Sequence, residues 1–582
     1  MMPDSMTEKP RLGRAPKIVL ALFALALLLF TKSEPMSWAD ASRMGTIQSL
    51  VEHGTLSLDQ SDYLWQGDKV QLGGHFYSHQ PPMMALAGAL PYGALHWCGR
   101  GIADPGTYRI LTLTLVGLPV LLGLISLARL MRRIGASDGQ TACLLAAASF
   151  GTLLLPYSLV LNQHGLAAGL VLLALSAIYN RRLATAGILL ALATTVDLTA
   201  VFFAVAVVLP IAFPGLLERT KRGASGGLGA VLRYGLAALP ILALHFGINY
   251  SIAGDWKPLG LHTEGFEYSM SPFLLMSLTG GGEGGPDGSF LAYAKGALVG
   301  ESGLFSHSPT LLWAWILGVL GVLAHIKVAD REVDDCKGTA EATNLVALIA
   351  AIDLAALGIL FYYLTQSRNF GGSSFGMRWF TVFSPALFLL PALWFRLADK
   401  KMARRALLCL APLLLWSCMA SALGAVQPWS KFHYRYTDSP EGALNIDVAT
   451  YPSATQHLQG EWDRITNFKK VFTLKSYDDL FQKLLDQHRR LYLTDWGGMT
   501  EEGRKLWLEE GLSKLRHVAD LFDRENSKVQ SRTVSHFWLA KFHIKLGELK
   551  EARRELEIAL ALDPSFRLAA DSLQALNSTK HN

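Results

Sequence analysis

Charged residues are scarce in this chain. Of its 582 residues only 17% are Asp, Glu, Lys or Arg, whereas 51% are hydrophobic. Soluble domains carry about 25% charged residues, because each needs a hydrated surface. The shortage excludes a string of soluble domains, and the high apolar content excludes an intrinsically disordered chain. The composition therefore indicates a protein that crosses a membrane several times.

Cysteine is also rare, and the chain lacks the usual metal and nucleotide signatures. The five cysteines have no CxxC or Cys/His spacing, so we expect free thiols rather than a disulfide framework or a zinc site. They are Cys98, Cys143, Cys336, Cys409 and Cys418. The Gly-rich segment 279–285 is not followed by Gly-Lys-Ser/Thr, which excludes a Walker-type phosphate loop. The net charge of +6 is spread over short loops, which argues against a nucleic-acid partner.

Long apolar runs are abundant, and each is near the ~20 residues that a membrane helix needs. We predict eleven spans, near 16–31, 110–131, 140–160, 164–180, 183–198, 199–216, 231–250, 309–326, 343–364, 378–396 and 406–425. The fifth and sixth form one run that is interrupted only around Asp197, so we interpret them as two short helices that meet at this polar break.

The placement of basic residues predicts the orientation. Lys and Arg occur before the first predicted span and then in every second loop, which by the positive-inside rule faces the cytoplasm. These residues include Arg11, Arg14, Lys17, Arg132, Arg133, Arg181, Arg182, Lys221, Arg222, Lys327, Arg331, Lys400, Lys401, Arg404 and Arg405. We expect an all-α polytopic membrane domain over residues 1–425, with its first span retained, and an extracytoplasmic, mostly helical domain over 426–582.

Three loops, about 32–109, 250–308 and 366–377, then share the outer face with the tail. Asp40 lies about nine residues beyond the first span, where a carboxylate can act as general base toward a hydroxyl at the membrane surface. Because residues 40–53 look helical, this loop by itself favours the alternative explanation of Asp40 as a helix N-cap. Pro82, in turn, is well placed to begin a helix.

Two arginines flank the Gly/Ser-rich turn of the third outer loop. Arg368 and Arg378 stand on the side of the membrane that is otherwise poor in basic residues. Arginine binds phosphate in a bidentate manner and keeps its charge when partly desolvated. The alternative is that both side chains reach toward lipid headgroups.

Taken together, these motifs resemble the bacterial GT-C glycosyltransferases, the group that includes protein O-mannosyltransferases and the lipid A aminoarabinose transferase. The matching segments, in order, are Asp40 with Arg43, Tyr77 to Pro82, Asn162 to His164, Gly303 to Pro309 and Ser374 to Trp379. Their order over about 400 residues carries the resemblance, since no single motif is specific.

The resemblance implies transfer of a monosaccharide from a polyprenyl-phosphate donor to a hydroxyl of a lipid, glycan or protein, with inversion and with Asp40 as general base. It implies substrate or phosphate contacts at Arg43, Tyr77, His79, Gln80, Arg368 and Arg378, and further candidates are Glu52, His164, Asp255 and His307. The family usually has Asp-Lys where this chain has His79-Gln80, so protonated His79, Arg43 or Arg378 must supply the missing positive charge. No cofactor is required, and a divalent metal is unsupported: Asp40, Glu52 and Asp255 could ligate one but form no specific pattern.

The tail has the spacing of one tetratricopeptide-like repeat. Leu539, Gly547, Ala552, Leu556, Ala559 and Pro564 fall at the expected intervals, which predicts a helical hairpin over about 533–577 that could bind a peptide. We expect short strands near 471–474 and 490–493 before it. The overall expectation is a multi-pass enzyme of the bacterial inner membrane, in contact with membrane lipids.

Three other functions are compatible with the sequence. A non-catalytic scaffold or a transporter fits the topology, and Asp197 is the main candidate for the mid-membrane charge that a transporter would carry. A ligase for lipid-linked oligosaccharides also shares this arrangement.

Overall fold

The computed structural model describes residues 11–64, 68–104, 106–212, 227–266, 290–300, 302–329, 339–367, 370–371, 374–426, 428–429, 529–564 and 566–578, with isolated residues between 509 and 523. The described chain is mostly helical, as expected. Cys336, Arg368, the Gly-rich segment 279–285 and the strands expected at 471–474 and 490–493 lie outside these residues.

Five helical segments are long and apolar enough to cross a membrane. They are Thr107–Ile134, Gly227–Ala253, Leu345–Gln366, Arg378–Leu397 and Lys400–Val426. A sixth follows if the bent pair Phe290–His307 and Pro309–Ala324 forms one span. Each of the eleven predicted apolar runs contains helix, but the remaining helices are shorter, so a multi-pass helical protein is supported and the count of eleven is not confirmed.

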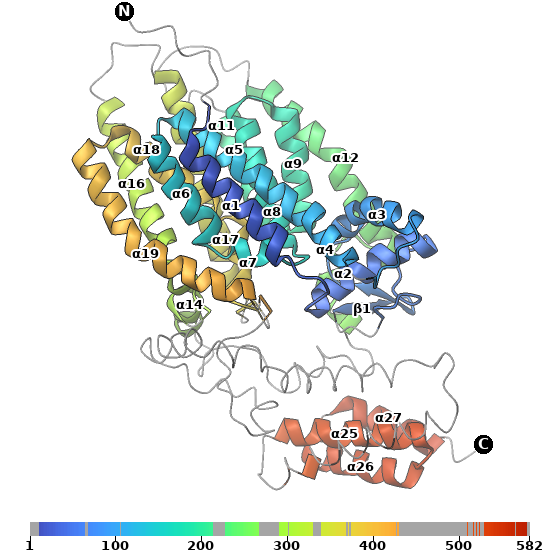
Figure 1. Cartoon of the computed structure of the whole chain (residues 1–582). Helices are drawn as coiled ribbons and strands as arrows, with labels where there is room; N and C mark the ends of the chain where they lie inside the picture. The colour runs from blue at the N-terminus through green and yellow to red at the C-terminus, as the bar shows by residue number, and fades with distance from the viewer. Residues whose placement is uncertain are drawn as a thin grey trace, which may run out of the picture.

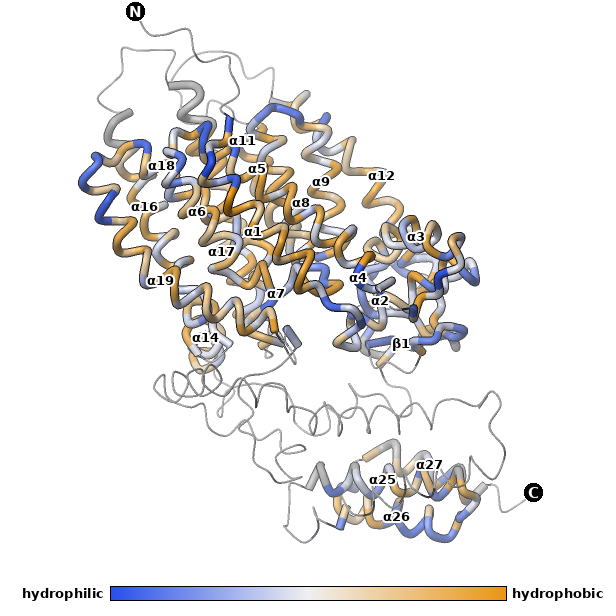
Figure 2. The backbone as a smooth tube through the Cα atoms, viewed as in Figure 1, coloured by the Kyte–Doolittle hydropathy of each residue, from blue (hydrophilic) through white to orange (hydrophobic). Residues whose placement is uncertain are grey.

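The helices pack side by side into one bundle with a continuous apolar core, and Figure 2 shows that hydrophobic residues dominate along their length. Its elements are α1 (Arg14–Phe30), α4 (Thr107–Thr112), α5 (Leu118–Ile134), α6 (Asp138–Phe150), α7 (Leu154–Ser158), α8 (Gln163–Tyr179), α9 (Leu183–Val196), α10 (Val201–Ala206), α11 (Val208–Ala212), α12 (Gly227–Ala253), α14 (Phe290–Val299), α15 (Leu304–His307), α16 (Pro309–Ala329), α17 (Thr339–Gln366), α18 (Leu390–Leu397) and α19 (Lys400–Val426). Figure 1 shows this bundle.

The first loop forms a small unit at one end of the bundle (Figure 1). It contains α2 (Trp38–Gln48), a π-helical turn (Ser49–His53), the hairpin of β1 (Lys69–Leu72) and β2 (His75–Ser78), and α3 (Pro82–Trp97). Gly73 and Gly74 join the strands with φ of +57° and +88°, which suits the two-residue turns that match strand twist. Pro82 begins α3 as predicted.

The apolar run at 183–212 breaks at Asp197, as predicted. Helix α9 ends at Val196, and a 3₁₀ turn, Leu198–Ala200, leads into α10. The carboxylate of Asp197 accepts hydrogen bonds from the backbone N–H (3.2 Å) and the hydroxyl (2.8 Å) of Thr199. Asp197 therefore satisfies donors that the break in the helix leaves without backbone partners.

The C-terminal helices pack on one another as the repeat spacing predicted. They are α25 (Val529–Leu546), α26 (Leu549–Leu562) and α27 (Arg567–Ser578). A small core of Phe537, Ala540, Leu556, Ala559, Phe566 and Ala569 joins them. Gly547, with φ of +77°, makes the turn between the first two helices. The helical hairpin is thus present, whereas its identity as a tetratricopeptide-like repeat stays a prediction.

Close packing of α5 against α8 depends on two glycines. A Cβ on Gly169 would lie 2.7 Å from the carbonyl carbon of Pro119, and one on Gly123 would lie 2.9 Å from the carbonyl oxygen of Gly169. Backbones approach this closely in membrane bundles only at small residues.

We expect Gly169→Ala to destabilise the protein by about 1–3 kcal/mol, because the added methyl group meets backbone that cannot move aside. The matched control is Gly235→Ala in α12, where a Cβ meets nothing within 4 Å. Thermal unfolding of the detergent-solubilised protein should show a lower Tm for the first variant alone. Equal Tm values for both variants would contradict the assigned crossing.

Candidate functional site

The site is built around Asp40, which lies in the first turn of α2. The N-cap of that helix is Ser37, whose hydroxyl accepts a hydrogen bond from the backbone N–H of Asp40 at 3.1 Å. The explanation of Asp40 as the N-cap is therefore wrong. Although the sequence places Asp40 close to the membrane surface, its side chain is 0% exposed, so the carboxylate is enclosed by protein.

The two oxygens of the Asp40 carboxylate have different surroundings. Oδ2 accepts hydrogen bonds from the hydroxyl of Tyr108 (2.9 Å), the indole N–H of Trp429 (3.1 Å) and the backbone N–H of Met36 (3.4 Å). Oδ1 is buried and has no hydrogen-bond partner within the described part of the chain. Burial raises the pKa of Asp40 to about 6, although Arg43 and the hydrogen bonds act in the opposite direction.

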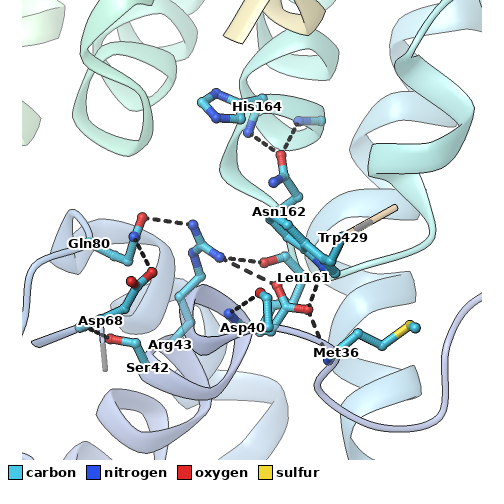
Figure 3. A network of polar contacts seen from close by, with 12 residues as sticks. Met36, Asp40, Ser42, Arg43, Asp68, Gln80, Leu161, Asn162, His164 and Trp429 are labelled. Atoms are coloured by element: carbon cyan, nitrogen blue, oxygen red, sulfur yellow. Dashed lines mark hydrogen bonds and ion pairs between the residues drawn. The ribbon is translucent and has the colours of Figure 1, made fainter. Parts of the chain in front are cut away.

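Arg43 lies one turn further along α2 and holds the first loop against the bundle (Figure 3). Its Nη1 donates to the carbonyl of Leu161 at 2.9 Å and lies 3.6 Å from Oδ1 of Asp40, and its Nη2 donates to Oε1 of Gln80 at 2.8 Å. Burial lowers the pKa of Arg43 to about 10, so the guanidinium still carries its charge at neutral pH. These protein acceptors occupy the arginine that was expected to meet phosphate.

Gln80 relays this contact to the loop before β1. Its amide Nε2 lies 3.3 Å from the carboxylate of Asp68 and 2.8 Å from Nε2 of His79. Burial lowers the pKa of His79 more than the neighbouring Asp68 raises it, and Arg43 and Arg378 lower it further. A protonated His79 is therefore not the source of positive charge at neutral pH, which leaves that role to an arginine.

Arg378 is the second arginine of the site and lies at the start of the 3₁₀ segment Arg378–Val382. Its guanidinium carbon is 4.9 Å from the ring centroid of Trp429, a cation–π distance. Within the described residues it forms no ion pair, and its buried Nε has no hydrogen-bond acceptor. Arg378 thus carries a positive charge that no described carboxylate neutralises.

Tyr157 fixes the two segments that bring Arg378 and Trp429 together. Its hydroxyl lies 2.7 Å from the carbonyl of Phe375 and 3.2 Å from that of Pro428, and its ring packs edge-on against Trp429. The backbone N–H of Phe375 donates to the same Pro428 carbonyl at 2.9 Å. The loop before Arg378 and the residues after α19 are therefore held to α7.

The first turn of α8 borders the same region. Asn162 is its N-cap, and its Oδ1 accepts hydrogen bonds from the backbone N–H groups of His164 (2.8 Å) and Gly165 (3.4 Å). Nδ1 of His164 lies 2.5 Å from Oδ2 of Asp197, and both side chains are buried. Figure 3 shows Asn162 between His164 and the group around Asp40.

Four other predicted residues have partners elsewhere. Tyr77 pairs with Val70 in the hairpin, and Glu52 accepts hydrogen bonds from Gln48 and Tyr92. Asp255 is half exposed and lies 3.3 Å from His262. His307 packs edge-on against Phe375, and its Nδ1 lies 2.9 Å from the carbonyl of Gly303. In the described part of the chain, Asp40, Glu52 and Asp255 do not come together as a metal-binding group.

Sequence reasoning missed Tyr108, Asp68, Tyr157 and Trp429. Tyr108 is hidden at the outer end of a predicted span, Tyr157 lies within another, and Trp429 marked only the boundary before the tail. None has a motif around it that would have identified it. Comparison with known proteins finds no family model that matches the chain and no curated protein with significant similarity to it.

Proposed function

We propose that this protein is an inverting glycosyltransferase of the GT-C type, which transfers a monosaccharide from a polyprenyl-phosphate donor to a hydroxyl acceptor. One observation carries the proposal. A fully buried aspartate has one carboxylate oxygen without a hydrogen bond and shares its site with an arginine that no described carboxylate neutralises. A base beside an unneutralised cation is what removal of a proton and departure of a phosphate together require.

The chemistry assigns one role to each side of the site. Oδ1 of Asp40 takes the proton of the acceptor hydroxyl while that oxygen forms a bond to the anomeric carbon. The bond from this carbon to the phosphate oxygen breaks, and its electron pair leaves with the polyprenyl phosphate. Arg378 stabilises the charge that accumulates there, because a guanidinium pairs with phosphate oxygens in a planar, bidentate manner.

The membrane context suits a lipid-linked donor. The site lies where the first loop meets the bundle, near the start of α8 (Figure 1). In the proposed topology of eleven helices, with the N-terminus in the cytoplasm of a bacterial inner membrane, this end faces outward. The polyprenyl chain would remain among the apolar helices while its phosphate reaches Arg378.

The transporter alternative depends on an unpaired charge within the membrane. Asp197 was the candidate, and it is hydrogen bonded to His164 and Thr199. A carboxylate with these partners stabilises the break between α9 and α10 and supplies no unpaired charge to a transport pathway. We therefore retain the transferase as the proposed function.

Replacing the base should abolish transfer. We expect Asp40→Asn to lower kcat by about 10²–10⁴-fold, since the amide cannot accept the proton. Its oxygen can still accept from Tyr108 and Trp429, but Arg43 loses its buried counterion, so the Tm of the variant is measured beside transfer to separate loss of the base from loss of the fold. The assay follows labelled sugar from polyprenyl-phosphate mannose or aminoarabinose into membrane acceptors. Asp104→Asn, an exposed aspartate of the same loop, serves as the control, and an Asp40→Asn enzyme as active as this control would refute the assigned base.

The pH dependence should reveal the buried base. Because the pKa of Asp40 is about 6 and only the ionised carboxylate accepts a proton, kcat/KM should be half-maximal near pH 6. Below this point it should fall about tenfold per pH unit, and from about pH 7 it should level off. A midpoint near 4, the ordinary value for an aspartate, would show that the base is solvated.

Arg378 should determine donor affinity. We expect Arg378→Gln to weaken binding of polyprenyl phosphate by about 10–100-fold, the loss of a charge-assisted contact. Arg378→Lys should retain part of the affinity for polyprenyl phosphate, because lysine keeps the positive charge but lacks the planar, bidentate geometry of arginine. The readout is the ligand-induced rise in Tm. Arg109→Gln is the control, because Arg109 donates to the carbonyl of Leu28 outside the site. Equal loss in both arginine-to-glutamine variants would argue against a specific phosphate contact.

A further inference from the structure

The hydrogen bonds of Asp40 are distributed unequally over its carboxylate. Met36, Tyr108 and Trp429 all donate to Oδ2, and within the described residues no donor reaches Oδ1. Arg43 approaches Oδ1 only to 3.6 Å, and the same nitrogen already donates to the carbonyl of Leu161.

A carboxylate oxygen has about two lone-pair directions, so three donors at Oδ2 leave no room for a proton there. Protonation of Oδ2 would displace one of these donors and leave it without an acceptor in a buried site. The free-energy cost of such an unsatisfied buried donor exceeds the net contribution of a formed hydrogen bond. Oδ1 can take a proton without displacing a hydrogen-bond donor, and what protonation weakens there is its charge interaction with Arg43 at 3.6 Å. The donors at Oδ2 therefore determine that Oδ1 is the oxygen that accepts a proton.

Trp429 is well suited to this task because its indole nitrogen only donates. Its ring is fixed between Tyr157 (5.8 Å between ring centroids) and the guanidinium of Arg378 (4.9 Å). The carbonyl of the preceding Pro428 accepts hydrogen bonds from Phe375 and Tyr157. The bundle thus holds the ring of Trp429 and the backbone before it through contacts that do not involve Asp40.

We propose that Trp429, from the segment after α19, is a positioning residue: with Tyr108 it saturates Oδ2 of Asp40 and assigns Oδ1 as the oxygen that accepts the proton of the acceptor hydroxyl. This inference rests on the proposed function. It also gives the outer segment that leads into the C-terminal domain a direct part in the reaction, since Trp429 contacts both the base and Arg378.

The test is Trp429→Phe, which removes the N–H and keeps an aromatic ring against Arg378 and Tyr157. Loss of a donor to the carboxylate disfavours its ionised form and raises its pKa. We expect the midpoint of kcat/KM against pH to move up by roughly half a unit to one unit, from near 6. Above the new midpoint, activity should return to within about threefold of wild type.

The matched control is Trp416→Phe in α19. The indole of Trp416 donates to the carbonyl of Ser306 at 2.8 Å and does not contact Asp40. This variant should keep the wild-type midpoint. Tyr108→Phe removes a different donor to Oδ2 and should also move the midpoint upward. If Trp429→Phe does not fold, Tyr108→Phe provides the test instead. A lower plateau without a moved midpoint in either variant would overturn the inference.

A second readout separates this inference from the proposed function. Infrared difference spectra across pH should contain a protonated-carboxyl band that is absent in Asp40→Asn, and its titration should move upward in Trp429→Phe. If the band moves but no donor supports transfer by wild type, the contact stands and the proposed function fails. If transfer occurs and depends on Asp40 but neither midpoint moves, the positioning role fails.

Discussion

The buried ion pair of Asp40 and Arg43 is the constraint on which the rest of the site depends. Removing two charges from water is expensive, and their mutual attraction offsets that cost only when other hydrogen bonds satisfy them. Here those bonds come from distant parts of the chain: Tyr108 from α4, the Leu161 carbonyl before α8, Gln80 before α3 and Trp429 after α19. Satisfying this one pair therefore joins the first loop to the bundle and to the start of the tail.

The same arrangement leaves one arginine of the site, Arg378, without a carboxylate partner among the described residues. Asp40 faces Arg43, while Arg378 contributes a second guanidinium, which lies over the ring of Trp429 and forms no ion pair among the described residues. Asn162 caps the first turn of α8, so the positive end of the α8 dipole lies in the same region. Arg378 is half-buried and its Nε is shielded from solvent, so an anionic ligand at its guanidinium would offset the part of its desolvation cost that no described carboxylate covers.

The parts of this structure that could be predicted from the sequence are those that local chemistry decides. The length of the apolar runs correctly predicts helix within all eleven of them. The polar residues around Asp197 correctly predict a break, since a carboxylate there can satisfy the interrupted backbone. Asp40 was recognised from its position, but its burial was not. Tyr108 and Trp429 lie 68 and 389 residues away from it, and only tertiary packing brings them together. The N-cap was misassigned because Ser37 and Asp40 are equally good cap residues by type.

The depth of the site follows from helix lengths. Helices α8 and α9 leave the same basic turn at Arg181 and Arg182 and run for 17 and 14 residues, or about 25 and 21 Å. Both lengths are less than the ~30 Å of a hydrocarbon core. In the proposed orientation, the His164–Asp197 pair at their far ends therefore lies below the outer membrane surface. In that orientation the part of the site formed by the first turn of α8 lies within the outer leaflet. A polyprenyl phosphate could then place its phosphate at Arg378 while its chain stays in lipid.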